Sequence, residues 1–234
     1  MTYTWLLFDA DGTLFNFDRA EAEALAHSFA DQGLPCSADT TAAYHRFNKQ
    51  VWDEFEAGTI TAPALRLKRF ALLFHSLGLD LDLPDFSRRY TGHLGMGAYL
   101  VDGAKELICA LRGRCGLAII TNGLSEVQRS RLARSELAGC FEHLFISEEM
   151  GAAKPDTAYF DAVFATLGSV PRGQVLVIGD SLNSDIRGGI AYGLDTCWYN
   201  PEGLPAPAGI APRYEVRRLD EVLDLPGMPA REAV

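Results

Sequence analysis

The pattern of hydrophobic positions changes once along the chain. A short apolar run at residues 3–8, "YTWLLF", is followed by a long segment whose apolar positions recur three and four residues apart. That spacing, with a glycine near the end of each stretch, is typical of amphipathic helices. The pattern predicts a strand at 3–8 and helices over 19–33, 39–58, 61–78 and 82–95.

Beyond Tyr99, short apolar runs such as "GLAII" and "VLVIG" alternate with helical stretches. Continuous apolar strands that alternate with helices favour a parallel sheet covered on both faces. The segment 200–212 is rich in Pro and Gly and is expected to be a loop, and residues from 226 onward are expected to be a frayed tail. Strands are predicted at 116–120, 143–147, 175–179, 195–199 and 214–216, and helices at 103–112, 125–137, 156–167 and 185–192.

The order of these elements predicts an α/β fold, a Rossmann-like parallel sheet with a helical insertion after its first strand. We expect residues 1–15 and 99–234 to form the α/β core and residues 16–98 to form the helical insertion. Ligands of open parallel sheets bind beyond the carboxyl ends of the strands. The residues at those ends are therefore the first candidates for chemistry.

Composition narrows the classes of function. The chain has 234 residues, of which 48% are hydrophobic and 22% charged, and its net charge is −10. This is the composition of a globular protein, and the negative charge disfavours binding to a nucleic-acid polymer or an anionic membrane. The chain shows no apolar run long enough for a membrane span and no signal-peptide pattern, so we expect a cytoplasmic protein. Its five cysteines form no CxxC pair, which favours packing thiols over a zinc site.

Two acids stand at the end of the first strand. Asp9 and Asp11 follow the apolar run directly, and residues i and i+2 of an extended chain point to the same side. Two like charges about 4 Å apart cost on the order of 4 kcal/mol at an effective dielectric constant of about 20. A divalent cation with oxygen ligands would offset that repulsion. Asp11-Gly12 is also a common turn signal, so for this pair alone a turn without chemistry stays open.

Polar groups also follow three later strands. Thr121 and Asn122 offer neutral donors suited to phosphate oxygens, although a strand-to-helix cap uses the same residue types. Lys154 precedes a proline in a short loop, where a surface lysine is the alternative. Asp180 and Asp185 follow the run "VLVIG", where a helix cap is the alternative. Each group alone therefore has an ordinary structural explanation.

Together, these strand ends hold the groups that a metal-assisted phosphoryl transfer needs. Such a transfer requires charge neutralisation, in-line positioning and a nucleophile. An aspartate can be that nucleophile and form an aspartyl-phosphate. Mg²⁺ suits a site of a few carboxylate oxygens together with waters and phosphate. The sequence therefore predicts Mg²⁺ as cofactor and a small phosphomonoester as substrate.

Four motifs resemble those of the haloacid dehalogenase (HAD) superfamily of phosphohydrolases. They are "DADGTL", "ITNG", "KPD" and "GDSLNSD", and they occur in the superfamily's order along the chain. The helical insertion lies where members of the superfamily carry a cap. The resemblance therefore implies a HAD core with an inserted α-helical cap domain.

The resemblance also implies a nucleophile and an acid–base group. Asp9 would be the nucleophile and a Mg²⁺ ligand. Asp11 would protonate the leaving alcohol and then activate the hydrolytic water, with its backbone carbonyl on the metal. In dehalogenases the position of Asp11 is usually not an acid, so Asp11 favours phosphate chemistry.

Five further roles follow from the same resemblance. Thr121 and Asn122 would bind the transferring phosphoryl group. Lys154 would bind it too, and would offset the repulsion between the nucleophile and the phosphate. Asp180 would ligate Mg²⁺ directly, and Asp185 would act directly or through a water and Lys154.

Longer stretches, among them "NKQVWDEFEAGTIT" and "SDIRGGIAYG", resemble the bacterial pyrimidine 5′-nucleotidase branch of the superfamily. This resemblance implies hydrolysis of nucleoside 5′-monophosphates such as UMP, dUMP and dTMP. Gly12 departs from the branch, some members of which carry Glu there. A sugar phosphate or another small phosphomonoester stays open as the substrate, and a non-catalytic binding module stays open as the other class of function. The sequence leaves the oligomeric state undetermined.

The cap would have to supply substrate selectivity, because the core recognises only phosphate. Asn48 and Lys49 face away from an apolar stripe of their helix and are candidates for reaching the active site. Phe15 and Phe17, in the linker to the cap, would either pack as part of a hinge or stack on a nucleobase. His45 has no ligand spacing with the other histidines and is expected to be a surface or core residue.

Overall fold

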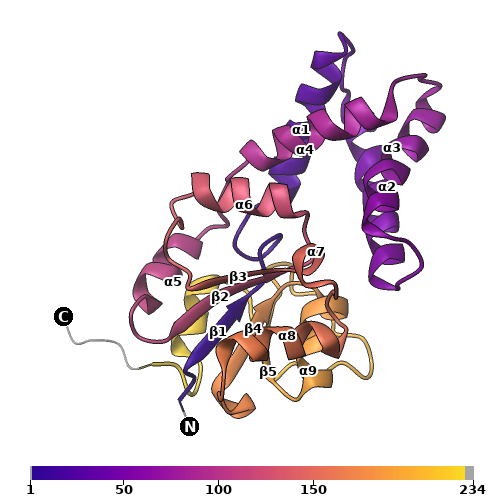
Figure 1. The fold of residues 1–234 in the computed structure, drawn as a ribbon. Coiled ribbons are helices and arrows are strands. Elements are labelled where there is room, and N and C mark those ends of the chain that lie inside the picture. Colours follow the sequence, from indigo (N-terminus) through magenta and orange to yellow (C-terminus); the bar gives the residue numbers. More distant parts are fainter. Residues whose placement is uncertain (1, 230–234) are drawn as a thin grey trace.

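A computed structural model describes residues 2–229 of the chain. In that range a single parallel sheet has the strand order β3-β2-β1-β4-β5-β6 (Figure 1). The predicted α/β class with a parallel sheet is confirmed. The strands are β1 (Trp5–Phe8), β2 (Gly116–Thr121), β3 (His143–Ile146), β4 (Val175–Gly179), β5 (Asp195–Tyr199) and β6 (Tyr214–Val216).

The strand order reverses between β1 and β4, which is where open α/β sheets bind their ligands. Phe8, the last residue of β1, lies beside Ile119 of β2 and Ile178 of β4. The three central strands therefore end near the same edge, and the polar residues that follow them meet there.

Helices cover both faces of the sheet, as the alternation of the strands requires. Phe8 points to one face and packs with Leu107 of α5 (Ala104–Leu111), whereas Leu7 points to the other and packs with Phe160 of α8 (Thr157–Leu167). Successive residues of a strand face opposite sides, so a central strand that is apolar throughout builds two cores at once. The remaining elements of this part are α6 (Ser125–Arg134), α7 (Ser147–Met150), η1 (Arg172–Gln174), the π-helical turn η2 (Leu182–Ile186), α9 (Arg187–Tyr192) and η3 (Leu219–Asp224).

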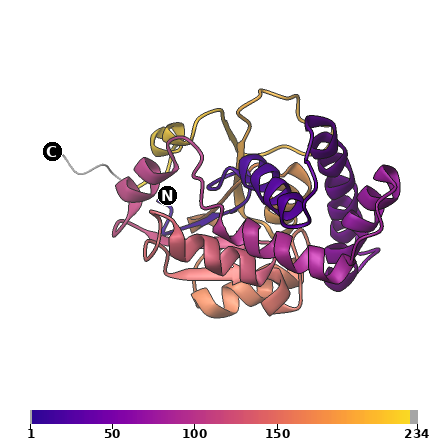
Figure 2. The same cartoon turned by 90° about the horizontal axis from the view of Figure 1, so that it is seen from above.

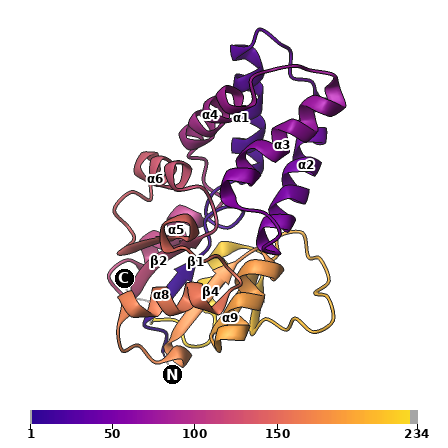
Figure 3. The same cartoon turned by 45° about the vertical axis from the view of Figure 1, so that its right-hand side comes forward.

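Four helices lie between β1 and α5 in the sequence and project beyond the carboxyl ends of the strands (Figures 1 and 3). Their first turns are capped by the side chains of Asn16, Ser37, Thr61 and Asp82, each of which accepts a backbone N–H three residues on. None of the helices within residues 2–229 is long and apolar enough to cross a membrane. The four helices are α1 (Phe17–Asp31), α2 (Ala38–Glu56), α3 (Ala62–Leu77) and α4 (Leu83–Met96).

Seen from above, the four helices gather on one side of the molecule, and the N-terminus lies away from α2 and α3 (Figure 2). Aromatic rings fill the space between them: Phe70 stacks on Tyr44 at a centroid distance of 5.3 Å and meets Phe86 edge-on at 5.1 Å. Leu124 and Val127, at the start of α6, pack into the same core. The inserted helices therefore have their own core, which α6 shares.

Two local predictions were wrong. Asp185 was placed at the start of a helix, but it lies inside the π-helical turn η2, before α9 begins. The tail was expected to fray from residue 226, but the backbone N–H of Tyr3 donates to the carbonyl of Gly227 over 2.7 Å, and Met228 packs on the core. An apolar residue beside the first strand is enough to hold this segment, and residues 230–234 lie outside the described residues.

The central strands should carry most of the stability that positions their ends. Leu176 of β4 is fully buried, so replacing it with Ala should lower the free energy of unfolding by about 2–5 kcal/mol. Leu204 is 54% exposed, and Leu204→Ala should change that free energy by less than about 0.5 kcal/mol. Urea unfolding followed by circular dichroism measures both, and equal effects would contradict this assignment of the core.

Candidate active site

The loop after β1 is interlocked with the end of β4. Gly12 has φ +90°, and a Cβ at this position would lie 2.5 Å from Oδ2 of Asp180. Only glycine fits both constraints, because the left-handed region and the close approach each exclude a side chain. The Thr13 hydroxyl donates to Oδ1 of Asp180 over 2.9 Å and accepts the backbone N–H of the same residue over 3.0 Å. Thr13 therefore fixes both the side chain and the backbone of Asp180 to the loop that follows β1.

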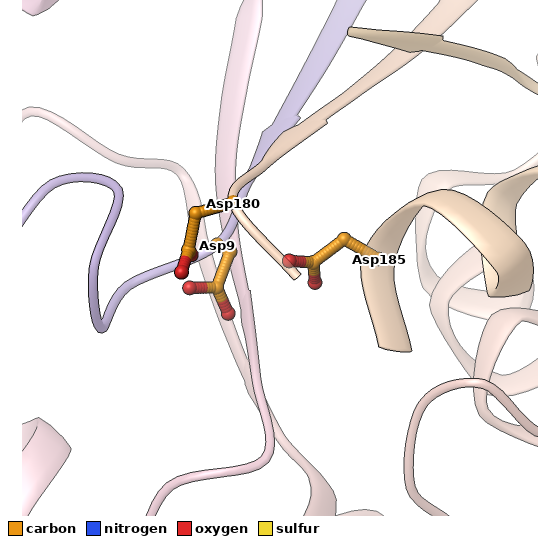
Figure 4. A group of neighbouring side chains, drawn as sticks. All are labelled: Asp9, Asp180 and Asp185. Atoms are coloured by element: carbon orange, nitrogen blue, oxygen red, sulfur yellow. The ribbon is translucent and has the colours of Figure 1, made fainter. Parts of the chain in front are cut away.

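Three carboxylates meet at this edge of the sheet. Asp9, Asp180 and Asp185 each offer an oxygen within 4.8 Å of the others (Figure 4). Asp9 follows β1 directly, Asp180 follows β4, and Asp185 comes from η2. A Cβ on Gly179 would lie 2.2 Å from Oδ2 of Asp185. The last residue of β4 must therefore be glycine for the Asp185 carboxylate to lie there.

Lys154 lies among these acids and is itself buried. Its Nζ donates to Oδ1 of Asp9 and to Oδ1 of Asp185, both over 2.6 Å, and to the carbonyl oxygen of Ile120 over 2.8 Å. The three donors of the ammonium are thus all used. A buried ammonium without such partners would cost several kcal/mol, so the position of Lys154 depends on the two acids.

Burial and charge shift the titration of this cluster. Burial raises the pKa of Asp9 well above its usual range, and Lys154 opposes that rise. Burial, with the charge of Asp185 adding to it, raises the pKa of Asp180 to about 7. For Lys154, burial alone would lower the pKa, but the carboxylates of Asp185 and Asp9 raise it above its usual value. The cluster therefore holds excess negative charge that its single ammonium does not balance.

The donor set fits a hard divalent cation. Three carboxylates converge within 4.8 Å, with one ammonium between two of them, and oxygen atoms are the ligands that Mg²⁺ prefers. A dication at this point would offset the repulsion that raises the pKa of Asp180.

Asp11 lies apart from the three acids. Its Oδ2 accepts from Nε2 of Gln128 over 2.5 Å, and its Oδ1 pairs with the guanidinium of Arg131, which is fully buried and lies over the ring of Phe15. The expectation that the side chains of Asp9 and Asp11 crowd one another is therefore wrong. The cation on α6 accounts for this difference, since it draws the Asp11 carboxylate toward that helix.

Thr121 and Asn122 follow β2 beside the acids. The Thr121 hydroxyl accepts the backbone N–H of Gly123 over 3.0 Å. Both ends of the Asn122 amide are occupied by the backbone of Lys154: Oδ1 accepts its N–H and Nδ2 donates to its carbonyl, each over 2.9 Å. Asn122 therefore clamps the loop that carries Lys154.

A cavity of about 310 Å³ opens above these residues. Its floor is the carboxylate cluster, and its opposite wall is made by α1 and α2. Of the residues named from the sequence, Asn48, Lys49 and Phe17 do line this cavity, and so does His45. Sequence reasoning missed four further residues that α1 and α2 contribute to the wall, Glu21, Trp52, Asp53 and Glu56. The helical period would place Trp52, Glu56, Asn48 and His45 on one face of α2, which is the signal that could have found two of them.

Known proteins resemble this chain over nearly its whole length. Residues 3–193 match the haloacid dehalogenase-like hydrolase family. The HAD-hydrolase YfnB of Bacillus subtilis is 40% identical over 94% of both chains. Its crystal structure, bound to magnesium, has a TM-score of 0.91 and covers 96% of this chain and 98% of its own. The pyrimidine 5′-nucleotidase YjjG of Escherichia coli is 36% identical and covers 96% of this chain and 98% of its own.

A second pyrimidine 5′-nucleotidase, PynA of Streptococcus pneumoniae, is 35% identical and covers 96% of this chain and 95% of its own. The L-2-haloacid dehalogenase of Xanthobacter autotrophicus has a TM-score of 0.75 at 18% identity, covering 94% of this chain and 97% of its own. The last likeness shows the fold alone.

The carboxylate cluster should make stability depend on pH and metal. Without metal, the pKa of Asp180 is about 7 in the folded protein and near 3.8 in the unfolded chain. Its ionisation therefore leaves the free energy of unfolding unchanged below about pH 4 and lowers it progressively as the pH rises to about 7. Asp180→Asn should therefore stabilise the protein in EDTA at pH 8 by more than about 1 kcal/mol, the equivalent of one pKa unit, and by much less at pH 5.

In saturating Mg²⁺ the wild type should be the more stable of the two proteins, because the variant lacks one carboxylate of the cluster. Chemical unfolding of both proteins at the two pH values, with EDTA and with saturating Mg²⁺, measures the effect. A wild type that gains no more stability from Mg²⁺ than the variant does would refute the metal site.

Proposed function

Since this chain belongs to the haloacid dehalogenase-like hydrolases, we propose that it is a Mg²⁺-dependent phosphatase of pyrimidine nucleoside 5′-monophosphates such as UMP, dUMP and dTMP. The observation that carries the proposal is the buried carboxylate of Asp9, which lies in the floor of the cavity and is held by Lys154 over 2.6 Å. The nucleotide part of the proposal is supported by the relatives named pyrimidine 5′-nucleotidases, which match the chain almost end to end.

The proposed reaction has two steps that use Asp9 and Asp11. An oxygen of Asp9 attacks phosphorus, the bond between phosphorus and the 5′ oxygen breaks, and Asp11 gives a proton to the departing nucleoside. A water then attacks phosphorus and gives its proton to Asp11, and the Asp9–phosphorus bond breaks to release inorganic phosphate. Gln128 and Arg131 hold the Asp11 carboxylate throughout, at the side of the cavity.

Other residues neutralise charge in this scheme. The hydroxyl of Thr121 binds one phosphoryl oxygen, and Lys154 exchanges one of its three present acceptors for another. Asn122 keeps the Lys154 loop in place. Asp9 and Asp180 would hold the metal with the backbone carbonyl of Asp11, and Asp185 would act directly or through a water. Bound Mg²⁺ supplies the remaining neutralisation of charge on the transferring group. Residues 16–98 act as the cap, which closes the cavity and excludes bulk water.

The phosphatase is tested by phosphate release from UMP, dUMP, dTMP, AMP and ribose 5-phosphate, each with Mg²⁺ and with EDTA. We expect release from the three pyrimidine nucleotides with Mg²⁺ and almost none with EDTA. Release mainly from ribose 5-phosphate would be consistent with the proposed mechanism but would contradict a pyrimidine nucleotide as the substrate. Full release in EDTA would contradict the dependence on Mg²⁺.

The nucleophile is tested by Asp9→Asn. An amide oxygen cannot form the aspartyl-phosphate, so kcat on dUMP should fall by at least about 10⁴-fold while the far-ultraviolet circular dichroism is unchanged. Asp80→Asn changes an exposed acid far from the cavity and should leave kcat as it is. Retention of a tenth or more of the activity by the Asp9 variant would show that another residue attacks phosphorus.

A further inference from the structure

The cap side of the cavity contains a polar network that the proposed reaction does not use. Glu21 of α1 is buried, with 3% of its side chain exposed, yet it carries a carboxylate. Its Oε1 accepts from Nδ2 of Asn48 over 2.7 Å, and its Oε2 accepts from Nδ1 of His45 over 2.8 Å. Behind it, Oδ1 of Asn48 accepts from the fully buried guanidinium of Arg69 over 3.3 Å.

Burying such a polar network costs free energy, and one of its members, His45, lies in the cavity wall. A buried carboxylate and a buried guanidinium lose their hydration, and apolar residues of similar size often stabilise a core at least as well. The network reaches the cavity at His45, whose side chain is 53% exposed and lines the wall opposite the acids. We propose that His45, oriented by Glu21, donates a hydrogen bond to an exocyclic carbonyl oxygen of the substrate's base, an inference that rests on the proposed function.

The hydrogen bond to Glu21 determines which ring nitrogen of His45 is available to a ligand in the cavity. It keeps the Nδ1–H on the side of the carboxylate and leaves Nε2 for the cavity. The protonated ring then donates from Nε2 to an acceptor. Uracil and thymine each present two exocyclic carbonyl oxygens, cytosine and guanine each present one, and adenine presents none. The hydrogen bond therefore favours uracil and thymine over adenine. The Glu21 hydrogen bond also raises the pKa of His45, which favours the donor form.

The same wall provides a surface for a flat ring. Trp52 follows His45 on α2, and Phe17 begins α1, and both line the cavity. Aromatic side chains stack on nucleobases irrespective of sequence, so they would add affinity, and the hydrogen bond from His45 would add discrimination. The cavity of about 310 Å³ lies within the range of ligand pockets.

Other charges face His45 and bear on its protonation. Asp18 and Glu21 of α1 favour the imidazolium, and Lys49 of α2 opposes it. Asp53 and Glu56 of α2 line the same wall, and across the cavity lie the acids Asp9, Asp11 and Asp180 and the ammonium of Lys154.

The inference is tested by comparing two substrates in His45 variants. dUMP carries the base, whereas p-nitrophenyl phosphate carries no base and no carbonyl oxygen, and its nitro oxygens are weak acceptors. His45→Ala should lower kcat/KM for dUMP by about 10- to 100-fold, mainly through KM, the range for a hydrogen bond to a charged donor. The same variant should change kcat/KM for p-nitrophenyl phosphate by less than about threefold. His75→Ala, at an exposed histidine of α3, is the matched control and should affect neither substrate.

The outcomes separate this inference from the function on which it rests. Equal losses on both substrates, or no loss on either, would overturn the role of His45 while the nucleotidase stands. A wild type that releases phosphate from p-nitrophenyl phosphate but from no pyrimidine nucleotide would overturn both. If His45→Ala does not fold, His45→Gln, which keeps a donor of similar length, is judged on the same ratio and should retain more discrimination than His45→Asn.

Glu21 acts only through His45, so its test is a pH profile. Glu21→Gln keeps an acceptor for Nδ1 but removes the charge, so the pKa of His45 should fall. The ratio of kcat/KM for dUMP to that for p-nitrophenyl phosphate should therefore decline at a lower pH in the variant than in the wild type. A structural role alone would lower activity without moving this midpoint, and an unmoved midpoint would contradict the positioning role.

Discussion

The ion pair between a buried ammonium and two buried carboxylates is the interaction on which the rest of the site depends. Lys154 donates to Asp9 and Asp185 over 2.6 Å each, and none of the three side chains is well exposed. Their meeting requires that β1 and β4 end at the same level and that Gly179, which Asp185 approaches, carries no side chain. Asn122 then fixes the Lys154 loop to the end of β2. The parallel sheet thus brings the charged residues that follow its strands together at one edge.

The inserted helices are linked to this edge by charge as well as by packing. Arg66 of α3 pairs with Glu126 of α6 and with Glu148 of α7, at 2.9 Å in both cases. Helix α6 in turn packs on α4 and holds Asp11 through Arg131. One helix of the core therefore contacts both the proposed acid–base group and the proposed cap. A shift of the cap relative to the core would be transmitted to the Asp11 side chain through α6.

Much of this arrangement could be predicted from the sequence, and the misses have physical causes. Strand ends are marked by a switch from apolar to polar residues, so Asp9, Thr121, Lys154 and Asp180 stood out. The partners of Asp11 did not, because Gln128 and Arg131 lie more than a hundred residues away on a helix with a weak apolar pattern.

The cap side was predicted least well. Glu21, His45 and Arg69 resemble ordinary surface residues in the sequence, and only the packing of α1 on α2 and α3 buries two of them. Charged residues are rarely buried, so periodicity alone assigns them to solvent.

The central claim is that Asp9 attacks phosphorus in a site completed by Lys154, Thr121 and Mg²⁺. A crystal structure of the protein with Mg²⁺ and vanadate, which adopts the five-coordinate geometry of a phosphoryl group in transfer, tests it most directly. The account predicts vanadium bonded to a carboxylate oxygen of Asp9, its oxygens contacted by Nζ of Lys154 and the hydroxyl of Thr121. Vanadate bonded to any other side chain, or held in the cavity without a bond to Asp9, would contradict it.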